Sequence, residues 1–137
     1  MKKYSVRYLR LIGTVLYACE GTKLRIDKRS GKPYYAIEFT NSDPKLVRLF
    51  VKFLREIIGI QEPKLKGLLL VYDDVNKKET EEFWSNYLKI PLSHFNKTVI
   101  HSSKGRNDLS PTGTFKVRYH SKEKRMFLEK MVKELSD

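Results

Sequence analysis

The first part of the chain carries apolar residues at the three- and four-residue spacing of an α-helix. This apolar set consists of Tyr8, Leu9, Ile12, Val15, Leu16 and Cys19. The spacing predicts a helix over residues 4–20. Gly21 follows directly, where a glycine in the left-handed conformation commonly ends a helix, so we expect such a cap there.

The next two segments alternate between apolar and polar residues, which is the period of a half-buried β-strand. They cover residues 23–28 and 34–40, and the sequence RSGKP between them is typical of a turn. Their alternating apolar positions are Leu24, Ile26, Tyr35, Ile37 and Phe39. We therefore expect the two strands to form a hairpin.

Three further helices are predicted where a capping residue precedes a helical apolar stripe. Asp43, followed by Pro44, begins the first of them, and Gly59 ends it. Asn76 begins the second helix, and Ser121 begins the last one. Each of these residue types accepts a hydrogen bond from the free N–H groups of a helix start.

Three more strands lie between these helices. Residues 64–74 form an almost continuous apolar run, which is typical of a strand buried on both faces. Shorter strands are expected around residues 96–102 and 113–120. The predicted order is α-β-β-α-β-α-β-β-α within one domain of residues 1–137, and the fold class is α+β with a mostly antiparallel sheet.

The excess of basic residues gives the first indication of function. The chain has 28 Lys and Arg against 16 Asp and Glu, a net charge of +12. Such an excess in 137 residues indicates a polyanionic partner, most simply nucleic acid, provided that the charges share one face. In the last strand Lys116, Arg118 and His120 alternate with apolar residues and so share a face. The alternative is that lysine is simply common on any solvent-facing sheet surface.

The predicted duplex-binding surface combines strand residues with residues of two loops. It comprises Lys23, Arg25, Lys28, Arg29, Lys32, Lys104, Arg106, Lys116, Arg118 and His120. Lysine and arginine neutralise phosphates, and the longer side chains reach base edges in the major groove of double-stranded DNA. The charge also permits an RNA-binding module, but no aromatic signature on a strand pair supports one.

Cysteine and histidine limit the redox and metal chemistry. The single cysteine, Cys19, excludes an intrachain disulfide and a cysteine-based zinc site, and the three histidines show no metal-ligand spacing. A reduced, cytoplasmic setting is expected. The N-terminal segment has the outline of a bacterial lipoprotein signal, but Arg7 and Arg10 restrict its apolar run to residues 11–19. That run is too short to span a bilayer, so no membrane partner is expected.

Glu20 is unusual because it ends an apolar helix, where the helix dipole disfavours negative charge. One explanation is an exposed carboxylate with a small energetic cost. The other is that two such helices pack side by side and bring two carboxylates together. Paired carboxylates bind divalent cations, which activate water and stabilise the leaving oxygen in phosphodiester cleavage.

The stretch GTVLYACEG, residues 13–21, resembles the nine-residue signature of the LAGLIDADG homing endonucleases. Glu20 stands at the last acidic position of that signature and Gly21 at its terminal glycine. The stretches EGTK, FTNSDP, FWSNYLKIP and GTFKVRYHS extend the resemblance over roughly residues 8–135. The pattern is similar to the compact single-motif branch of the family, which includes relatives that bind DNA without cutting it.

The resemblance implies a fold, an assembly and an activity. The implied fold is LAGLIDADG-like, with a saddle-shaped antiparallel sheet, and one motif per chain implies a homodimer. The implied dimer interface consists of Gly13, Thr14, Tyr17 and Ala18. Glu20, with Gly21 beside it, would hold Mg²⁺ at the dimer axis. The implied activity is Mg²⁺-dependent, site-specific cleavage of double-stranded DNA, with Lys122 near the scissile phosphates and Asp43 ordering water.

Some residues depart from the family pattern or have simpler explanations. Val15 and Ala18 stand where a glycine and a first acid are usual, which favours the alternative of a non-cleaving DNA-binding regulator. Asp43 is equally explained as a helix N-cap, and Lys122 as a solvated lysine. Packing roles are expected for Cys19, Trp84 and Tyr87.

Overall fold

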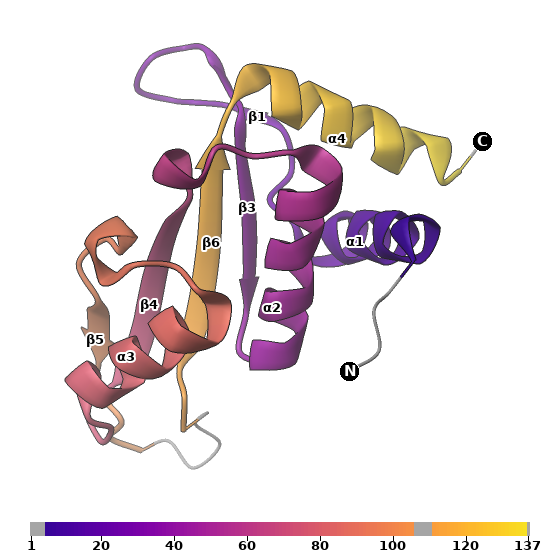
Figure 1. The fold of residues 1–137 in the computed structure, drawn as a ribbon. Helices are drawn as coiled ribbons and strands as arrows, with labels where there is room; N and C mark the ends of the chain where they lie inside the picture. The colour runs from indigo at the N-terminus through magenta and orange to yellow at the C-terminus, as the bar shows by residue number, and fades with distance from the viewer. Residues whose placement is uncertain (1–4, 106–110, 137) are drawn as a thin grey trace.

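The computed structural model describes residues 5–105 and 111–136 and shows an α+β fold (Figure 1). Its helices and strands are α1 (Val6–Glu20), β1 (Arg25–Ile26), β2 (Pro33–Tyr34), β3 (Ala36–Asn41), α2 (Pro44–Phe53), β4 (Lys66–Tyr72), α3 (Lys77–Leu88), β5 (Val99–His101), β6 (Thr114–His120) and α4 (Lys122–Glu134). A π-helical turn, Leu54–Ile58, continues α2, and 3₁₀ turns occur at Glu62–Lys64 and Leu92–His94. The predicted element order is confirmed, except that the second strand is divided into β2 and β3.

The helix boundaries follow the predicted capping residues. Asp43, Asn76 and Ser121 each accept a hydrogen bond from a backbone N–H two or three residues later. Gly59 ends the helical segment with φ of +78°, as expected. The left-handed cap predicted at Gly21 is wrong, because its φ is −74°. The chain leaves α1 in an extended conformation there, since Gly21 forms a β-bridge with the middle of β3.

The main sheet has the strand order β3-β6-β4-β5. β6 pairs antiparallel with both β3 and β4, whereas β5 runs parallel to β4. The prediction of a mostly antiparallel sheet is confirmed. The pair β4–β5 is the parallel exception, because α3 carries the chain back between the two strands, as a parallel connection requires. α2 and α3 cover one face of the sheet, while α1 and α4 lie beyond its β3 edge (Figure 1).

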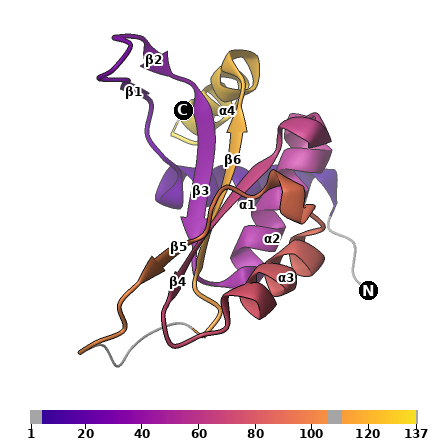
Figure 2. The ribbon, with the colours of Figure 1, turned by 90° about the vertical axis from the view of Figure 1, so that its left-hand side faces the viewer.

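The β1–β2 hairpin is separate from this sheet and projects beyond it (Figure 2). Leu24 and Ile26, predicted to lie on a buried face, are 43% and 59% exposed. The half-buried strand predicted here is wrong because no helix or strand among residues 5–105 and 111–136 covers the hairpin. β3 then pairs with β6 rather than with β1.

Aromatic side chains fill the core between the sheet and the helices α2 and α3. Trp84 of α3 stacks on Phe115 of β6 with ring centroids 4.9 Å apart, and its indole N–H donates to the Thr112 carbonyl. A Cβ on Gly67 would lie 2.4 Å from the Phe115 ring, so only glycine permits this approach. Trp84 is therefore a core residue, as predicted.

Burial along β4 alternates, which corrects the expectation of two buried faces. Gly67, Leu69 and Val71 are buried, whereas the intervening residues are only half-buried. The reason is that α2 and α3 lie on the other face of the sheet, and no helix in the described part of the chain covers this one. Cys19 is exposed, so its predicted packing role is also wrong. No helix in the described part of the chain combines the length and apolar character needed to cross a bilayer.

Candidate nucleic-acid interface

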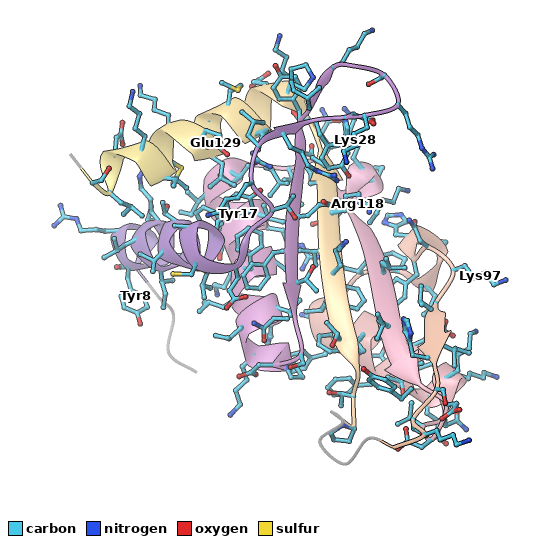
Figure 3. The ribbon with its side chains drawn as sticks, turned by 180° about the vertical axis from the view of Figure 1, so that it is seen from behind. Tyr8, Tyr17, Lys28, Lys97, Arg118 and Glu129 are labelled. Atoms are coloured by element: carbon cyan, nitrogen blue, oxygen red, sulfur yellow. The ribbon has the colours of Figure 1, made fainter. Side chains whose placement is uncertain are left out.

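The uncovered face of the sheet carries the basic residues that strand phasing predicted. Along β6, Phe115, Val117 and Tyr119 are buried against the helices, and Lys116 and Arg118 lie half-exposed on the other side. His120 ends the strand and is exposed. Figure 3 views this side, with Arg118 on β6 and Lys28 in the projecting hairpin. The predicted division of β6 into an apolar and a basic face is confirmed.

Strand register decides which residues stand beside these cations. Arg118 lies opposite Glu38 of β3 on one side and Lys66 of β4 on the other. Lys116 lies opposite Thr40 and Leu68. The centre of the uncovered face therefore holds the cations Lys66, Lys116 and Arg118 and the carboxylate of Glu38. Glu38 pairs with Arg118, so the two lysines supply the net positive charge.

Glu38 is a residue of this face that sequence reasoning missed. Its residue is 3% exposed, and its Oε2 accepts a hydrogen bond of 2.7 Å from Arg118 Nε and one of 3.2 Å from the Tyr34 hydroxyl. Burial opposes ionisation of the carboxyl, but the Arg118 hydrogen bond and the charges of Lys116 and Arg118 hold its pKa below the ordinary value. Alternation already placed Glu38 on this face, yet only the pairing of β3 with β6 shows its partner.

Tyr34 links this pair to the projecting hairpin. The guanidinium of Arg25 lies 4.6 Å from the centroid of the Tyr34 ring, and His120 meets the same ring edge-on at 5.8 Å. Burial, followed by the charge of Glu38, raises the pKa of the Tyr34 hydroxyl, which keeps it protonated and able to donate. Arg25 is thus placed over the Tyr34 ring of the hairpin and remains exposed.

The remaining predicted basic residues lie in loops at two ends of the sheet. Lys28, Arg29 and Lys32 are exposed in the β1–β2 hairpin, and Lys104 is exposed in the loop after β5. Figure 2 shows the hairpin and the β5 loop projecting on the same side of the molecule. Arg106 lies outside the described residues. The two loops therefore extend the basic face along its length.

Lys23 differs from the other predicted contacts. Its ammonium donates a 2.7 Å hydrogen bond to the carbonyl of Ala18 in the last turn of α1. A cation at this position offsets the negative end of the helix dipole. Lys23 thus stabilises the C-terminal end of α1, immediately beside Glu20.

Glu20 is exposed at the end of α1 and makes no hydrogen bond or ion pair within the described ranges 5–105 and 111–136. The chain beyond it is held rigidly. A Cβ on Gly21 would lie 2.4 Å from the Tyr17 ring, and the Tyr17 hydroxyl donates to the Thr22 carbonyl at 2.8 Å. The carboxylate is therefore presented on a fixed backbone with its oxygens available.

Arg125 of α4 fastens this backbone to the rest of the fold. Its side chain is 0% exposed and donates to the carbonyls of Ala36 and Thr22 at 2.6 and 2.8 Å. It also pairs with Glu129 at 2.8 Å and lies 5.2 Å from the Tyr17 ring centroid. Figure 3 labels Tyr17 on α1 and Glu129 on α4. This buried arginine, which sequence reasoning also missed, ties the segment after Glu20 to α4.

The three predicted catalytic residues do not form one cluster within a chain. Gly21, next to Glu20, bridges to the middle of β3, whereas Asp43 and Lys122 follow opposite ends of the β3–β6 ladder. The six residues of β3 separate those ends by about 20 Å. Asp43 accepts from Lys45 N at 2.9 Å and is a helix N-cap, and the Lys122 ammonium lies 5.4 Å from the Tyr35 ring centroid.

The predicted dimer interface is largely turned inward. Gly13, Thr14 and Tyr17 are buried within their own chain, and a Cβ on Gly13 would lie 2.1 Å from the Phe53 ring. Close approach between α1 and the α2 segment, rather than between two copies, explains this glycine. Ala18 alone of the predicted set is partly exposed.

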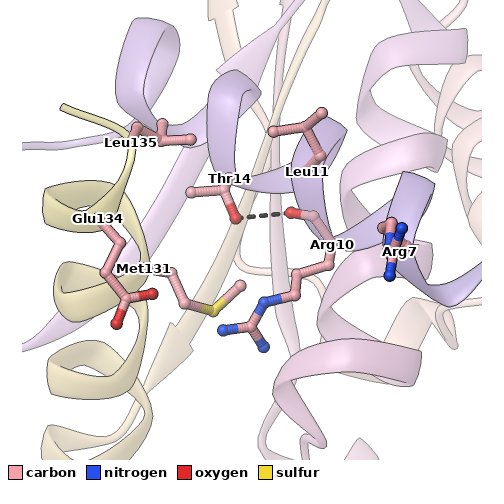
Figure 4. Close-up of a pocket in the computed structure, with 7 residues that line it drawn as sticks. All are labelled: Arg7, Arg10, Leu11, Thr14, Met131, Glu134 and Leu135. Carbon is pink, nitrogen blue, oxygen red and sulfur yellow. Dashed lines mark hydrogen bonds between the residues drawn. The ribbon is translucent and has the colours of Figure 1, made fainter. Parts of the chain in front are cut away.

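α4 covers the Thr14 side of α1. An open hollow lies between the two helices, where the Thr14 hydroxyl donates to the Arg10 carbonyl (Figure 4). The residues that line it are Arg7, Arg10, Leu11, Thr14, Met131, Glu134 and Leu135. Next to this hollow, the exposed side of α1 carries the apolar residues Tyr8, Leu11 and Val15, which are 47%, 56% and 41% exposed. Arg7 and Arg10 are exposed beside them.

Comparison with models of known protein families, with curated proteins and with solved structures finds no match to this chain.

Proposed function

We propose that the chain is a homodimeric, Mg²⁺-dependent endonuclease that cleaves double-stranded DNA at specific sites, on a LAGLIDADG-like scaffold. The observation that carries the proposal is the position of Glu20. This exposed, unpaired carboxylate ends a helix that exposes the apolar residues Tyr8, Leu11 and Val15, beside a sheet whose uncovered face is basic. A second copy and a polyanionic substrate would complete such a site.

The open face of α1 supports the homodimer. Tyr8, Leu11 and Val15 follow one another at three- and four-residue spacing, so they form one continuous apolar strip along the helix. A second copy related by a twofold axis would cover the strip with its own, as isologous interfaces do. α1 would then be shared between subunits rather than enclosed by one.

The donor set fits Mg²⁺ only in such a dimer. Within the parts of the chain that the structure describes, no three His, Cys, Asp or Glu side chains gather to hold a metal. Mg²⁺ keeps several waters and is held by one or two carboxylates together with substrate phosphates, so one Glu20 from each copy is a sufficient protein contribution. When bound, the ion would supply activation of water and stabilisation of the leaving oxygen.

Different residues of the chain would then contact different parts of the duplex. Lys66, Lys116 and the hairpin cations neutralise phosphates along the uncovered face. Glu20 meets the duplex from the end of α1, and Lys23 together with Arg125 keeps that end in place. Lys122 at the start of α4 supplies a further exposed cation.

The alternative function is a DNA-binding regulator that does not cleave. The observation that favours it is the separation of Asp43 and Lys122 at opposite ends of β3, because these two residues cannot then both act beside Glu20 in one chain. Both functions share the homodimer and the basic face, so they differ only in the role of Glu20.

A cleavage assay distinguishes the two functions. The protein is incubated with a library of long duplexes in Mg²⁺, alongside Glu20→Gln and the control Glu82→Gln, which changes an exposed carboxylate on α3. The nuclease predicts discrete products from the parent and from Glu82→Gln, with binding but no products from Glu20→Gln. Salt-sensitive binding without cuts from any variant would establish the regulator instead.

A further inference from the structure

Glu38 is a carboxylate on a face whose neighbouring charges are positive. A negative charge facing DNA repels phosphates, so its presence at the centre of the sheet weakens non-specific binding. Its side chain is 4% exposed while that of its partner Arg118 is 34% exposed. The carboxylate therefore lies beneath the guanidinium and acts on the duplex only through Arg118.

The contact fixes one end of the guanidinium. Arg118 donates through Nε, and its two terminal amino groups have no hydrogen-bond partner within the ranges 5–105 and 111–136. Glu38 is itself held by the Tyr34 hydroxyl, so the carboxylate cannot swing away freely. A side chain that is normally flexible is thus restricted to one orientation by groups from β2 and β3.

An arginine held in this way suits bases better than phosphates. The ion pair leaves little net charge, so Arg118 adds little to the attraction of the backbone. Its two terminal amino groups still form a planar pair of donors, which matches the N7 and O6 acceptors of guanine in the major groove. Lys66 and Lys116 beside it, which no described carboxylate pairs by a salt bridge, are the better phosphate contacts.

We infer that Arg118, oriented by Glu38, reads guanine, so that each copy of the chain specifies one G·C pair in the duplex. Glu38 is here a positioning residue that touches no base. This inference rests on the proposed function insofar as it requires the uncovered sheet face to meet double-stranded DNA, but it is independent of cleavage.

The test is selection from a random duplex library without divalent metal, followed by sequencing of the bound fraction. The proteins are the parent, Arg118→Lys, Glu38→Gln and the control Arg48→Lys, which makes the same change on α2 on the covered side. The parent and the control should show a symmetric pair of guanine positions. Arg118→Lys should reduce guanine preference at that pair roughly 5- to 150-fold and leave the other positions unchanged.

Glu38→Gln separates orientation from structure. It should lower guanine preference several-fold without weakening binding to random duplex, because it removes a negative charge; a purely structural role would weaken both. Thermal unfolding checks that each variant is folded. If Glu38→Gln does not fold, the guanine preference of Arg118→Lys tests the inference by itself. Duplex binding in which no guanine position depends on Arg118 overturns this inference alone, whereas no duplex binding by the parent overturns the proposed function as well.

Discussion

At the scale of single residues, two buried or half-buried arginines organise the candidate site. Arg118 is partly exposed and donates a hydrogen bond to the buried carboxylate of Glu38. Arg125 is fully buried and donates hydrogen bonds to backbone carbonyls. The first is free to contact a ligand and the second is not. Burial, rather than charge, therefore separates a recognition residue from a structural one.

Arg125→Met should destabilise the chain by about 3 kcal/mol, because the carbonyls of Ala36 and Thr22 lose their donors and Glu129 loses its partner. Urea unfolding followed by circular dichroism measures the change. Arg48→Met, which removes a cation near the Tyr87 ring on the surface of α2, should cost less than about 1 kcal/mol. Equal losses for the two variants would contradict the structural role of Arg125.

Tyr17 should make stability fall at alkaline pH. Burial raises the pKa of its hydroxyl from 10.0 to about 12, so the folded state keeps a proton that the unfolded state releases. The stabilisation of about 3 kcal/mol is present below pH 10 and is lost as the pH rises from about 10 to about 12. Ultraviolet titration of the parent and of Tyr17→Phe measures which titration step disappears with Tyr17. Loss of a step near pH 12 is expected, whereas loss of a step near pH 10 would contradict the burial of Tyr17.

At the scale of elements, α1 has three different surroundings around its circumference. One side packs on the α2 segment through Gly13 and Tyr17, a second faces α4 through Thr14, and the third is the open strip of Tyr8, Leu11 and Val15. The helix is therefore anchored within its own chain while it keeps three apolar residues exposed.

Leu11→Glu should convert the dimer to a monomer, because it places a charge in the middle of the open strip, where the partner's apolar residues would cover it. Met126→Glu is the matched control, since Met126 is 46% exposed on α4 against 56% for Leu11. Sedimentation velocity should give a monomer for Leu11→Glu and a dimer for the parent and the control. A monomeric parent would remove the paired-carboxylate site from the proposal.

At the scale of the whole molecule, the layers assign a role to each face. Helices α2 and α3 cover one side of the sheet (Figure 1). Lys66, Lys116 and Arg118 lie on its other side, and further basic residues lie in the loops that extend it. Association with a duplex should be governed by phosphate neutralisation and should weaken steeply with salt.

Lys116→Gln should make duplex binding less salt-dependent. Each lost phosphate contact lowers the slope of log affinity against log salt by about 0.9, so a dimer that carries two copies should lose about 2. Fluorescence anisotropy across a range of KCl concentrations measures the slope. Lys52→Gln, on α2 beside Glu56, should leave it unchanged, and an equal effect from both variants would argue against a directed basic face.

The sequence by itself determined the type and order of the elements, the caps at Asp43, Asn76 and Ser121, and the alternation of β6, because these depend on residues close together in the chain. Tertiary structure alone decided what covers each face. It placed Glu38 beside Arg118, 80 residues away in sequence, and enclosed Arg125 against Thr22, 103 residues away.

The same reason explains the predictions that failed. Local alternation in residues 23–28 could not reveal that the hairpin lacks a covering layer, and the small residues of α1 could not reveal which neighbour they approach. A residue's period along the chain gives its phase on an element, but its partner depends on which distant segment packs there. For this protein, the alternation along β6 located the basic face, and only the packing of β3 against β6 identified Glu38 as the partner of Arg118.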